Sequence, residues 1–245
     1  QTVFGEGSTC LVAKLGNGVE LTNGPIEGLA LEEAGSERAV IRYELPLVDD
    51  RGVAHFRSVI RLHVYARMPF SRLVHRLVVT SPVLGEAFSS DNLDHVTPEL
   101  EHVRSAVVGT QGEATSLLDV ESLELILPWR GDGDGIRRRI VHEHDRAYRA
   151  EWGTEVRQQE GHWPGTLTLA SAQTNFALCV KNFWQTYPKG VRYDGDGVAL
   201  EILPKLSGRE LPDYDELWHR LYFWYDSETA RYRLKVGMAL TTEML

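Results

Sequence analysis

The chain has 245 residues, of which 42% are hydrophobic, a composition typical of a folded globular protein. Its formal net charge is −9 at pH 7 and it has no basic stripe or arm, which argues against nucleic acid as the main partner. No run approaches the roughly 18–20 apolar residues of a membrane span, so we expect no membrane partner. The polar residues Gln1–Thr9 do not resemble a signal peptide, and the chain begins with Gln rather than Met. We therefore expect a processed product or a piece excised from a longer protein.

Apolar and polar residues alternate with a period of two over the first third of the chain, which is the pattern of half-buried β-strands. The first two expected strands, Cys10–Lys14 and Val19–Thr22, flank the hairpin signal Gly16–Gly18. Long strands follow on either side of the turn Asp49–Gly52, where Gly allows a positive φ. Since each long strand follows the last directly, the pattern predicts an antiparallel meander. Its three strands are expected at Ile41–Leu47, His55–Tyr65 and Arg72–Thr80.

The remainder of the chain also predicts strands, with a long irregular excursion over Ser81–Thr110. Only Pro212–Trp224 has helical spacing. The sequence therefore predicts an all-β fold, a large antiparallel β-sandwich of the supersandwich kind with one or two short helices, spanning residues 1–245 as a single domain. A closed barrel is the competing architecture. The later strands are expected at Leu117–Leu127, Gly165–Ala170, Phe176–Lys181, Val198–Leu203 and Leu234–Leu240.

The residues that could bind metal give no strong signal. Cys10 and Cys179 lack zinc spacing, and they are either bridged or two buried free thiols. Asp132–Gly135 lacks the further ligands of a calcium loop, so a solvated turn is the better interpretation. In His142–Asp145 two imidazoles would share a strand face and could hold a metal. The arginines around this segment disfavour a cation, and we prefer a solvated charged strand or loop. We expect no metal and no cofactor.

The segment Val180–Lys189 is the most informative part of the chain. Three aromatic residues are interleaved with amides and ammonium groups. Flat aromatic faces beside such donors suit a sugar ring, which has an apolar face and a rim of hydroxyls. Asn182, Trp184 and Gln185 are therefore candidate substrate-binding residues, and Lys189 could meet the carboxylate of an acidic sugar. The alternative is that the aromatic residues are core anchors.

A second candidate lies inside the third strand of the meander. His75 and Arg76 are adjacent, so one faces each surface of the sheet. Arginines on the preceding strand could complete a cationic surface for an anionic sugar, since Arg engages a carboxylate with two parallel bonds. The alternative is the ordinary solvated face of a sheet. Neither candidate carries a self-sufficient catalytic signature, because no GxSxG, HExxH, GxxxxGK[ST] or GxGxxG motif is present.

The segment Val180–Gly190, the strand Gly197–Pro204 and the run Leu234–Glu243 resemble the central region of exo-rhamnogalacturonan lyase-like proteins. The meander Arg38–Val79 is similar to the start of that region, as is Leu118-Asp-Val-Glu-Ser-Leu-Glu-Leu125. The resemblance implies that this chain is the central β-sandwich of a longer protein. An N-terminal barrel-like domain and a C-terminal α/α toroid of the same protein would be its partners. One departure is Thr242, where the family tends to carry a His.

The chemistry implied by the resemblance is β-elimination on an acidic polysaccharide of the rhamnogalacturonan type. The site must neutralise a uronate carboxylate and supply a base for the adjacent proton. By residue type Tyr187 and Lys189 are the catalytic candidates, and Asn182, Trp184, Gln185, His75 and Arg76 the binding candidates. The cleft would lie between the sandwich and the toroid, so we expect the chain alone to be inactive.

Two further functions remain open. The chain could be a non-catalytic carbohydrate-binding or scaffold sandwich, or the sandwich domain of a glycoside hydrolase or phosphorylase with the same helical partner. Its acidity and the implied substrate favour a secreted or periplasmic location over the cytoplasm.

Overall fold

The fold is all-β, as the sequence predicts. The computed structural model describes residues 11–81, 117–127, 129, 137–142, 146–170, 175–194, 197–205, 224–226 and 231–245. Within these ranges the chain forms antiparallel strands and one short 3₁₀ helix, η3 (Trp184–Thr186). Fifteen strands belong to one continuous sheet, and β11 and β12 pair as a separate hairpin. Two of the sheet's strands, β10 and β3, each pair with a single described strand, so the described sheet is open and is not a closed barrel.

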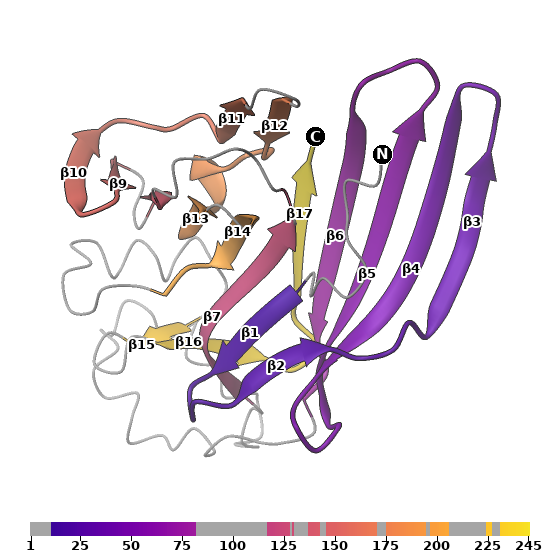
Figure 1. Ribbon diagram of the computed structural model, residues 1–245. Coiled ribbons are helices and arrows are strands. Elements are labelled where there is room, and N and C mark those ends of the chain that lie inside the picture. Colours follow the sequence, from indigo (N-terminus) through magenta and orange to yellow (C-terminus); the bar gives the residue numbers. More distant parts are fainter. Residues whose placement is uncertain are drawn as a thin grey trace, which may run out of the picture.

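One layer of the sandwich contains the predicted meander (Figure 1). β4, β5 and β6 pair in sequence order, and the last strand of the chain, β17, completes the layer by pairing with β6. Buried and exposed residues alternate along β5 and β6, because one face packs inward and the other meets solvent. The strands of this layer are β2 (Glu20–Asn23), β3 (Gly28–Ala34), β4 (Arg38–Val48), β5 (Ala54–Tyr65), β6 (Ser71–Val79) and β17 (Ala239–Met244).

The other layer runs in the order β10-β9-β8-β13-β14-β7-β1, and the β1–β2 hairpin joins it to the first. All six residues of β14 are buried, so this strand lies at the centre of the molecule. The strands are β1 (Leu11–Leu15), β7 (Leu117–Leu127), β8 (Arg138–His142), β9 (Ala147–Trp152), β10 (Glu155–Glu160), β13 (Lys189–Tyr193), β14 (Val198–Leu203), β15 (Trp224–Asp226) and β16 (Arg231–Lys235).

The inner faces of the two layers share one buried hydrophobic cluster. It includes Leu47 and Phe56 from the meander, and Leu125 and Leu200 from the other layer. Burial of these apolar side chains is the main favourable term in holding the layers together.

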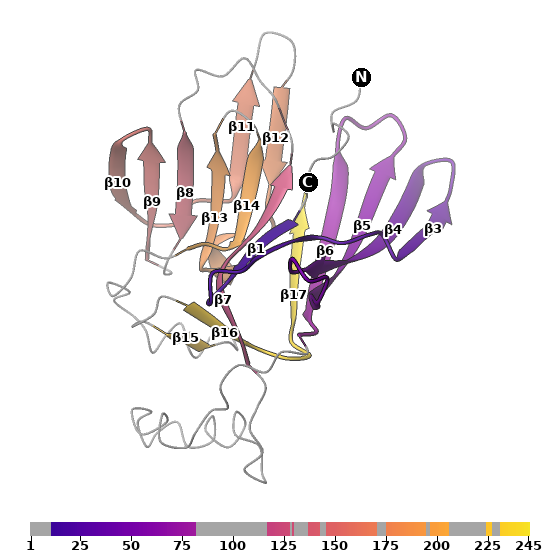
Figure 2. The ribbon, with the colours of Figure 1, turned by 60° about the horizontal axis from the view of Figure 1, so that its bottom comes forward.

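The hairpin β11 (Thr166–Ala170) and β12 (Asn175–Cys179) joins the end of β17 (Figure 2). Cys179 and Leu245 exchange two backbone hydrogen bonds of 2.9 Å, and Val180 forms a bridge with Met244. The segment after β12 is therefore tied to the last residues of the chain.

Most predicted strands are confirmed, but the end of the chain differs. The single strand predicted over Leu234–Leu240 is wrong: the chain turns between β16 and β17. Gly237 has φ +87° there, which a glycine adopts without strain. The interpretation of His142–Asp145 as a solvated charged strand or loop is also wrong for its described residue, because His142 is fully buried. Strands β3, β8, β9, β10, β13 and β15 were not predicted.

Several predictions fall outside the described residues. They are the turn at Asp132–Gly135, the possible metal ligands Glu143–Asp145, Cys10, all of Ser81–Thr110 except Ser81, and the predicted helix Pro212–Trp224 except its last residue. That last residue, Trp224, begins strand β15. Cys179 is an exposed free thiol, which contradicts both a bridge to it and its predicted burial.

Candidate functional site

The aromatic segment forms a tight turn between β12 and β13. Asn182 has φ +52°, a left-handed conformation that Asn tolerates better than most residues. The helix η3 follows, and a cis peptide bond joins Tyr187 to Pro188. Within residues 181–187, here called the aromatic turn, Phe183 and Tyr187 are buried, Trp184 is half-buried and the other four residues are exposed.

Three side chains of this segment point inward. Phe183 and Tyr187 are each 1% exposed, and Lys189 is 4% exposed. Phe183 packs edge-on against Trp163, with ring centroids 4.8 Å apart. The core interpretation thus holds for Phe183 and Tyr187. A substrate in solvent reaches neither the hydroxyl of Tyr187 nor the ammonium of Lys189, so the structure does not present them as an accessible acid–base pair.

Lys189, on the buried side of the aromatic turn, stabilises the turn through a chain of hydrogen bonds. Its Nζ donates to Thr186 Oγ1 at 2.9 Å, and Thr186 Oγ1 in turn donates to the carbonyl of Asn182 at 2.8 Å. Burial lowers the pKa of Lys189 to about 8, because the charged form loses its hydration. The residue is thus a positioning residue for the turn.

His142 lies directly across the β8–β13 pairing from Lys189. Its Nε2 accepts a 2.9 Å hydrogen bond from the backbone N–H of Trp163, so a neutral ring carries its proton on Nδ1. Its ring centroid lies 5.3 Å from that of Tyr148 and 5.9 Å from that of Phe183. The buried imidazole was missed as part of this site, since only the strand register brings it to Lys189.

The outer side of the aromatic turn carries a stacked aromatic pair. Trp184 is half-buried and stacks on exposed His162, with centroids 3.8 Å apart and planes 10° from parallel. Asn182, Gln185 and Lys181 beside it are exposed. His162 covers one face of the indole, and the Trp184 side chain as a whole keeps partial solvent exposure. The structure thus brings three binding candidates together, and adds His162, which gave no signal in the sequence.

His75 and Arg76 lie away from this turn, on β6. His75 is 1% exposed, and its Nε2 lies 3.0 Å from Ser58 Oγ. Burial lowers its pKa to about 4, so it is neutral at pH 7. A neutral interior imidazole offers nothing to a substrate in solvent, which removes the physical basis for a binding role. Arg76 is exposed on the opposite face of the sheet.

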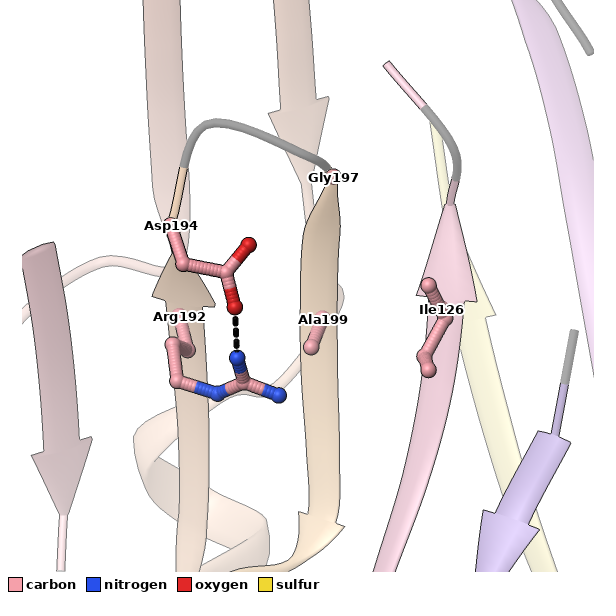
Figure 3. A pocket seen from close by; sticks show the side chains of 5 residues that line it. All are labelled: Ile126, Arg192, Asp194, Gly197 and Ala199. Carbon is pink, nitrogen blue, oxygen red and sulfur yellow. Dashed lines mark hydrogen bonds and ion pairs between the residues drawn. The ribbon is translucent and has the colours of Figure 1, made fainter. Parts of the chain in front are cut away.

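Buried and partly buried ion pairs cover the outer face of β8, β13 and β14. Arg139 Nε lies 2.9 Å from both carboxylate oxygens of Glu201. Arg192 pairs with Glu124 at 2.7 Å and with Asp194 (Figure 3). A hollow of about 180 Å³ lies beside this arginine, and Figure 3 shows the side chains that line it. It is small beside the roughly 300–1,000 Å³ of ligand pockets, and its arginine is already neutralised. We therefore assign this network to structure. The hollow is lined by Ile126, Arg192, Asp194, Gly197 and Ala199.

Asp49, His55 and Ser81 have the residue types of a nucleophilic triad, but they form a buried structural cluster of polar contacts. His55 Nδ1 lies 2.9 Å from Ser81 Oγ, and its Nε2 lies 3.5 Å from Asp49. Ser81 is only 3% exposed, whereas a nucleophile must reach its substrate. Although burial opposes ionisation, hydrogen bonds from the backbone of Val53 and from Arg51 hold the pKa of Asp49 at about 2. The carboxylate thus fixes the β4–β5 turn.

Metal and membrane features give no further site. In the described part of the chain, no group of three or more His, Cys, Asp or Glu side chains could hold a metal ion. No described helix is long and apolar enough to cross a bilayer.

Comparisons with known proteins identify no family. No family model matches the chain, and no curated protein matches it. Among solved structures it is similar to the GH36 alpha-galactosidase AgaA from Geobacillus stearothermophilus, with 9% identity and a TM-score of 0.32, covering 97% of this chain and 29% of that one. AgaB from the same organism gives 10% identity and a TM-score of 0.30, covering 97% and 30%. This chain thus spans less than a third of the length of either structure.

Proposed function

We propose that this chain is a β-sandwich domain of a polysaccharide lyase that acts by β-elimination on a uronate-containing, rhamnogalacturonan-like polysaccharide. The aromatic turn contributes one wall of its substrate cleft. The observation that carries the proposal is the partly exposed indole face of Trp184, which stacks on His162 and is flanked in the turn by the exposed amides of Asn182 and Gln185. A sugar ring stacks on such a face while amides bond its hydroxyls. The motif resemblance supplies the reaction class.

In this proposal the turn binds and the catalytic base comes from a neighbouring domain. Lys189 and Tyr187 are buried beneath the turn, so they act by holding Trp184 and its neighbours in place. A preorganised wall orients the polymer, which lowers the entropic cost of reaching the transition state.

The test compares the 245-residue chain with a longer parent protein on rhamnogalacturonan. We expect the parent to release unsaturated uronate, detected by ultraviolet absorbance, and the chain alone to release none. In the parent, Trp184→Ala should lower kcat/KM by about tenfold, mainly through KM. The variant loses one stacking contact between the sugar ring and the indole, which is worth about 1–2 kcal/mol. Its melting temperature should stay close to that of the wild type.

Trp152→Ala is the matched control, since Trp152 is 44% exposed at the far end of β9 from His142. If the parent releases no unsaturated product, or both tryptophan variants lose activity equally, the proposed function is wrong.

The runner-up is a non-catalytic carbohydrate-binding domain. It is favoured by the same partly exposed Trp184 together with the burial of both predicted catalytic residues. A parent that binds the polymer through Trp184 without cleaving it would establish this second function.

A further inference from the structure

The solvent face of β4, β5, β6 and β17 carries a local excess of positive charge on an acidic chain. Five cationic side chains share three carboxylates there and Arg76 adds a sixth cation, beside the one-to-one pair of Arg38 with Glu33, whereas the chain as a whole has a formal net charge of −9. We call this surface the arginine face; its cations are Arg42, Arg57, Arg61, Arg72, Arg76 and Lys181, and its carboxylates are Glu32, Glu44 and Glu243.

Each carboxylate of the arginine face is shared between two cations. Arg42 and Arg57 both contact the nearly buried Glu44. Arg42 lies 3.6 Å from Glu32, which also pairs with Arg61 at 2.8 Å. This half of the face therefore holds three guanidinium groups against two carboxylates.

The second half repeats the arrangement beside the aromatic turn. Glu243 accepts from Arg72 at 2.8 Å and from Lys181 at 3.2 Å, so one carboxylate again serves two cations. The backbone N–H of Lys181 also donates to the carbonyl of Glu243 at 2.9 Å, which makes the turn continuous with the sheet.

Arg76 lies between the two halves and makes no ion pair with any described residue. It is exposed, and the strand register places it opposite Val59 on β5 and opposite Thr241 on β17. Arg57 and Arg61 are its diagonal neighbours on the same face, at about 7–8 Å. Around Val59, Arg57 already pairs with Glu44 and Arg61 with Glu32, so of these three guanidinium groups Arg76 alone has no carboxylate partner among the described residues and can take an external anion.

We propose that the arginine face binds the carboxylates of an extended uronate oligosaccharide, as a subsite separate from the stacking surface of Trp184; the choice of a uronate ligand rests on the proposed function. A guanidinium fork matches a carboxylate with two parallel bonds, and the shared carboxylates hold the neighbouring forks in fixed positions. The flat face spans several strands, and Lys181 connects it to the aromatic turn. A polymer that crosses the face would thus be delivered to the proposed cleft wall.

The proposal is tested by titrating the 245-residue chain with an oligogalacturonate in isothermal calorimetry at low salt. The same oligosaccharide with its carboxyls methyl-esterified is the matched ligand. We expect the acid form to bind and the ester not to bind. Arg76→Gln should weaken the binding of the acid form by about three- to fivefold, which is the contribution expected of one exposed ion pair. Arg76→Glu should abolish binding.

Arg157→Gln is the control variant, since Arg157 is an exposed arginine paired with Glu155 on β10. Equal binding of acid and ester, or an equal effect of Arg76→Gln and Arg157→Gln, would overturn the proposal. So would Arg76-dependent binding of polyglutamate without binding of oligogalacturonate, because the occupant would then be an acidic polypeptide. The readout is binding rather than turnover, so it can fail while the proposed lyase function stands.

Discussion

Replacing Lys189 by Met should change how the stability of the protein depends on pH. Lys189 is 4% exposed, and its Nζ bonds Thr186 Oγ1. Met has a similar length and no charge, so the variant keeps most of the packing and loses both the ammonium and its hydrogen bond.

The magnitude follows from the lowered pKa of Lys189. The folded protein has a pKa of about 8 at this side chain, against an ordinary value of 10.5. At 1.36 kcal/mol per pKa unit, the buried ammonium destabilises the folded state by about 3 kcal/mol. Below pH 8 both states carry the proton, so the full cost is present. Between pH 8 and 10.5 the unfolded state holds more protons, so stability rises with pH, and above 10.5 the cost is gone.

The variant should therefore be more stable than the wild type at pH 7 and less stable at pH 10.5. Lys189→Met removes a cost of about 3 kcal/mol at pH 7 and loses one hydrogen bond of about 1 kcal/mol, a net gain of about 2 kcal/mol. At pH 10.5 only the lost hydrogen bond remains, which leaves the variant about 1 kcal/mol less stable.

Urea denaturation of both proteins at intervals from pH 7 to 10.5 measures this difference. Other titrating groups are common to both proteins and cancel in the subtraction. Lys181→Met is the control, since Lys181 is exposed and pairs with Glu243. A stability difference between the wild type and Lys189→Met that stays constant across this range would refute a desolvated ammonium at Lys189.

Three further changes test the packing described above. Gly165→Ala should lower the free energy of unfolding by about 3 kcal/mol in urea denaturation, because φ is +83° and the new Cβ would lie 2.5 Å from Cβ of Phe183; an unchanged midpoint would contradict this contact. Arg139→Met should cost about 3–5 kcal/mol in thermal denaturation, since it leaves the buried Glu201 without its main partner; the double variant with Glu201→Gln should recover part of the loss. His75→Gln should flatten the loss of stability between pH 6.5 and 4, because the wild-type folded state resists protonation there while the unfolded state accepts it; equal acid sensitivity of both proteins would argue against a buried neutral ring.

Local patterns predicted most of the strands and the pairing within the meander, but not which distant strands meet. The meander could be predicted because β4, β5 and β6 alternate clearly and are joined by short turns. β13 was missed because Lys189 and Arg192 interrupt its apolar pattern, although four of its five residues are buried. Lys189 was taken for a surface group because a lysine is rarely buried.

The candidate site could be located from the sequence but not resolved into its roles. The aromatic segment was identified by composition, while the side of the turn that each residue faces depends on the helix η3 and on the register of β13. His142 and His162 join the site through pairings with residues more than twenty positions away, which no local pattern encodes. The sharing of Glu243 between Arg72 and Lys181 is likewise a product of sheet order.

The pairing of β6 with β17 also determines when the meander can be completed during synthesis. Val78 lies opposite Ala239, so about 160 residues must be translated after one partner before the other exists. At about 5–20 residues per second, the edge of β6 waits roughly 10–30 s on the ribosome. During that interval its backbone donors and acceptors are open to other chains, a recognised route to misassembly. A nascent chain of this protein is therefore a natural client for chaperones that shield strand edges until the last residues emerge.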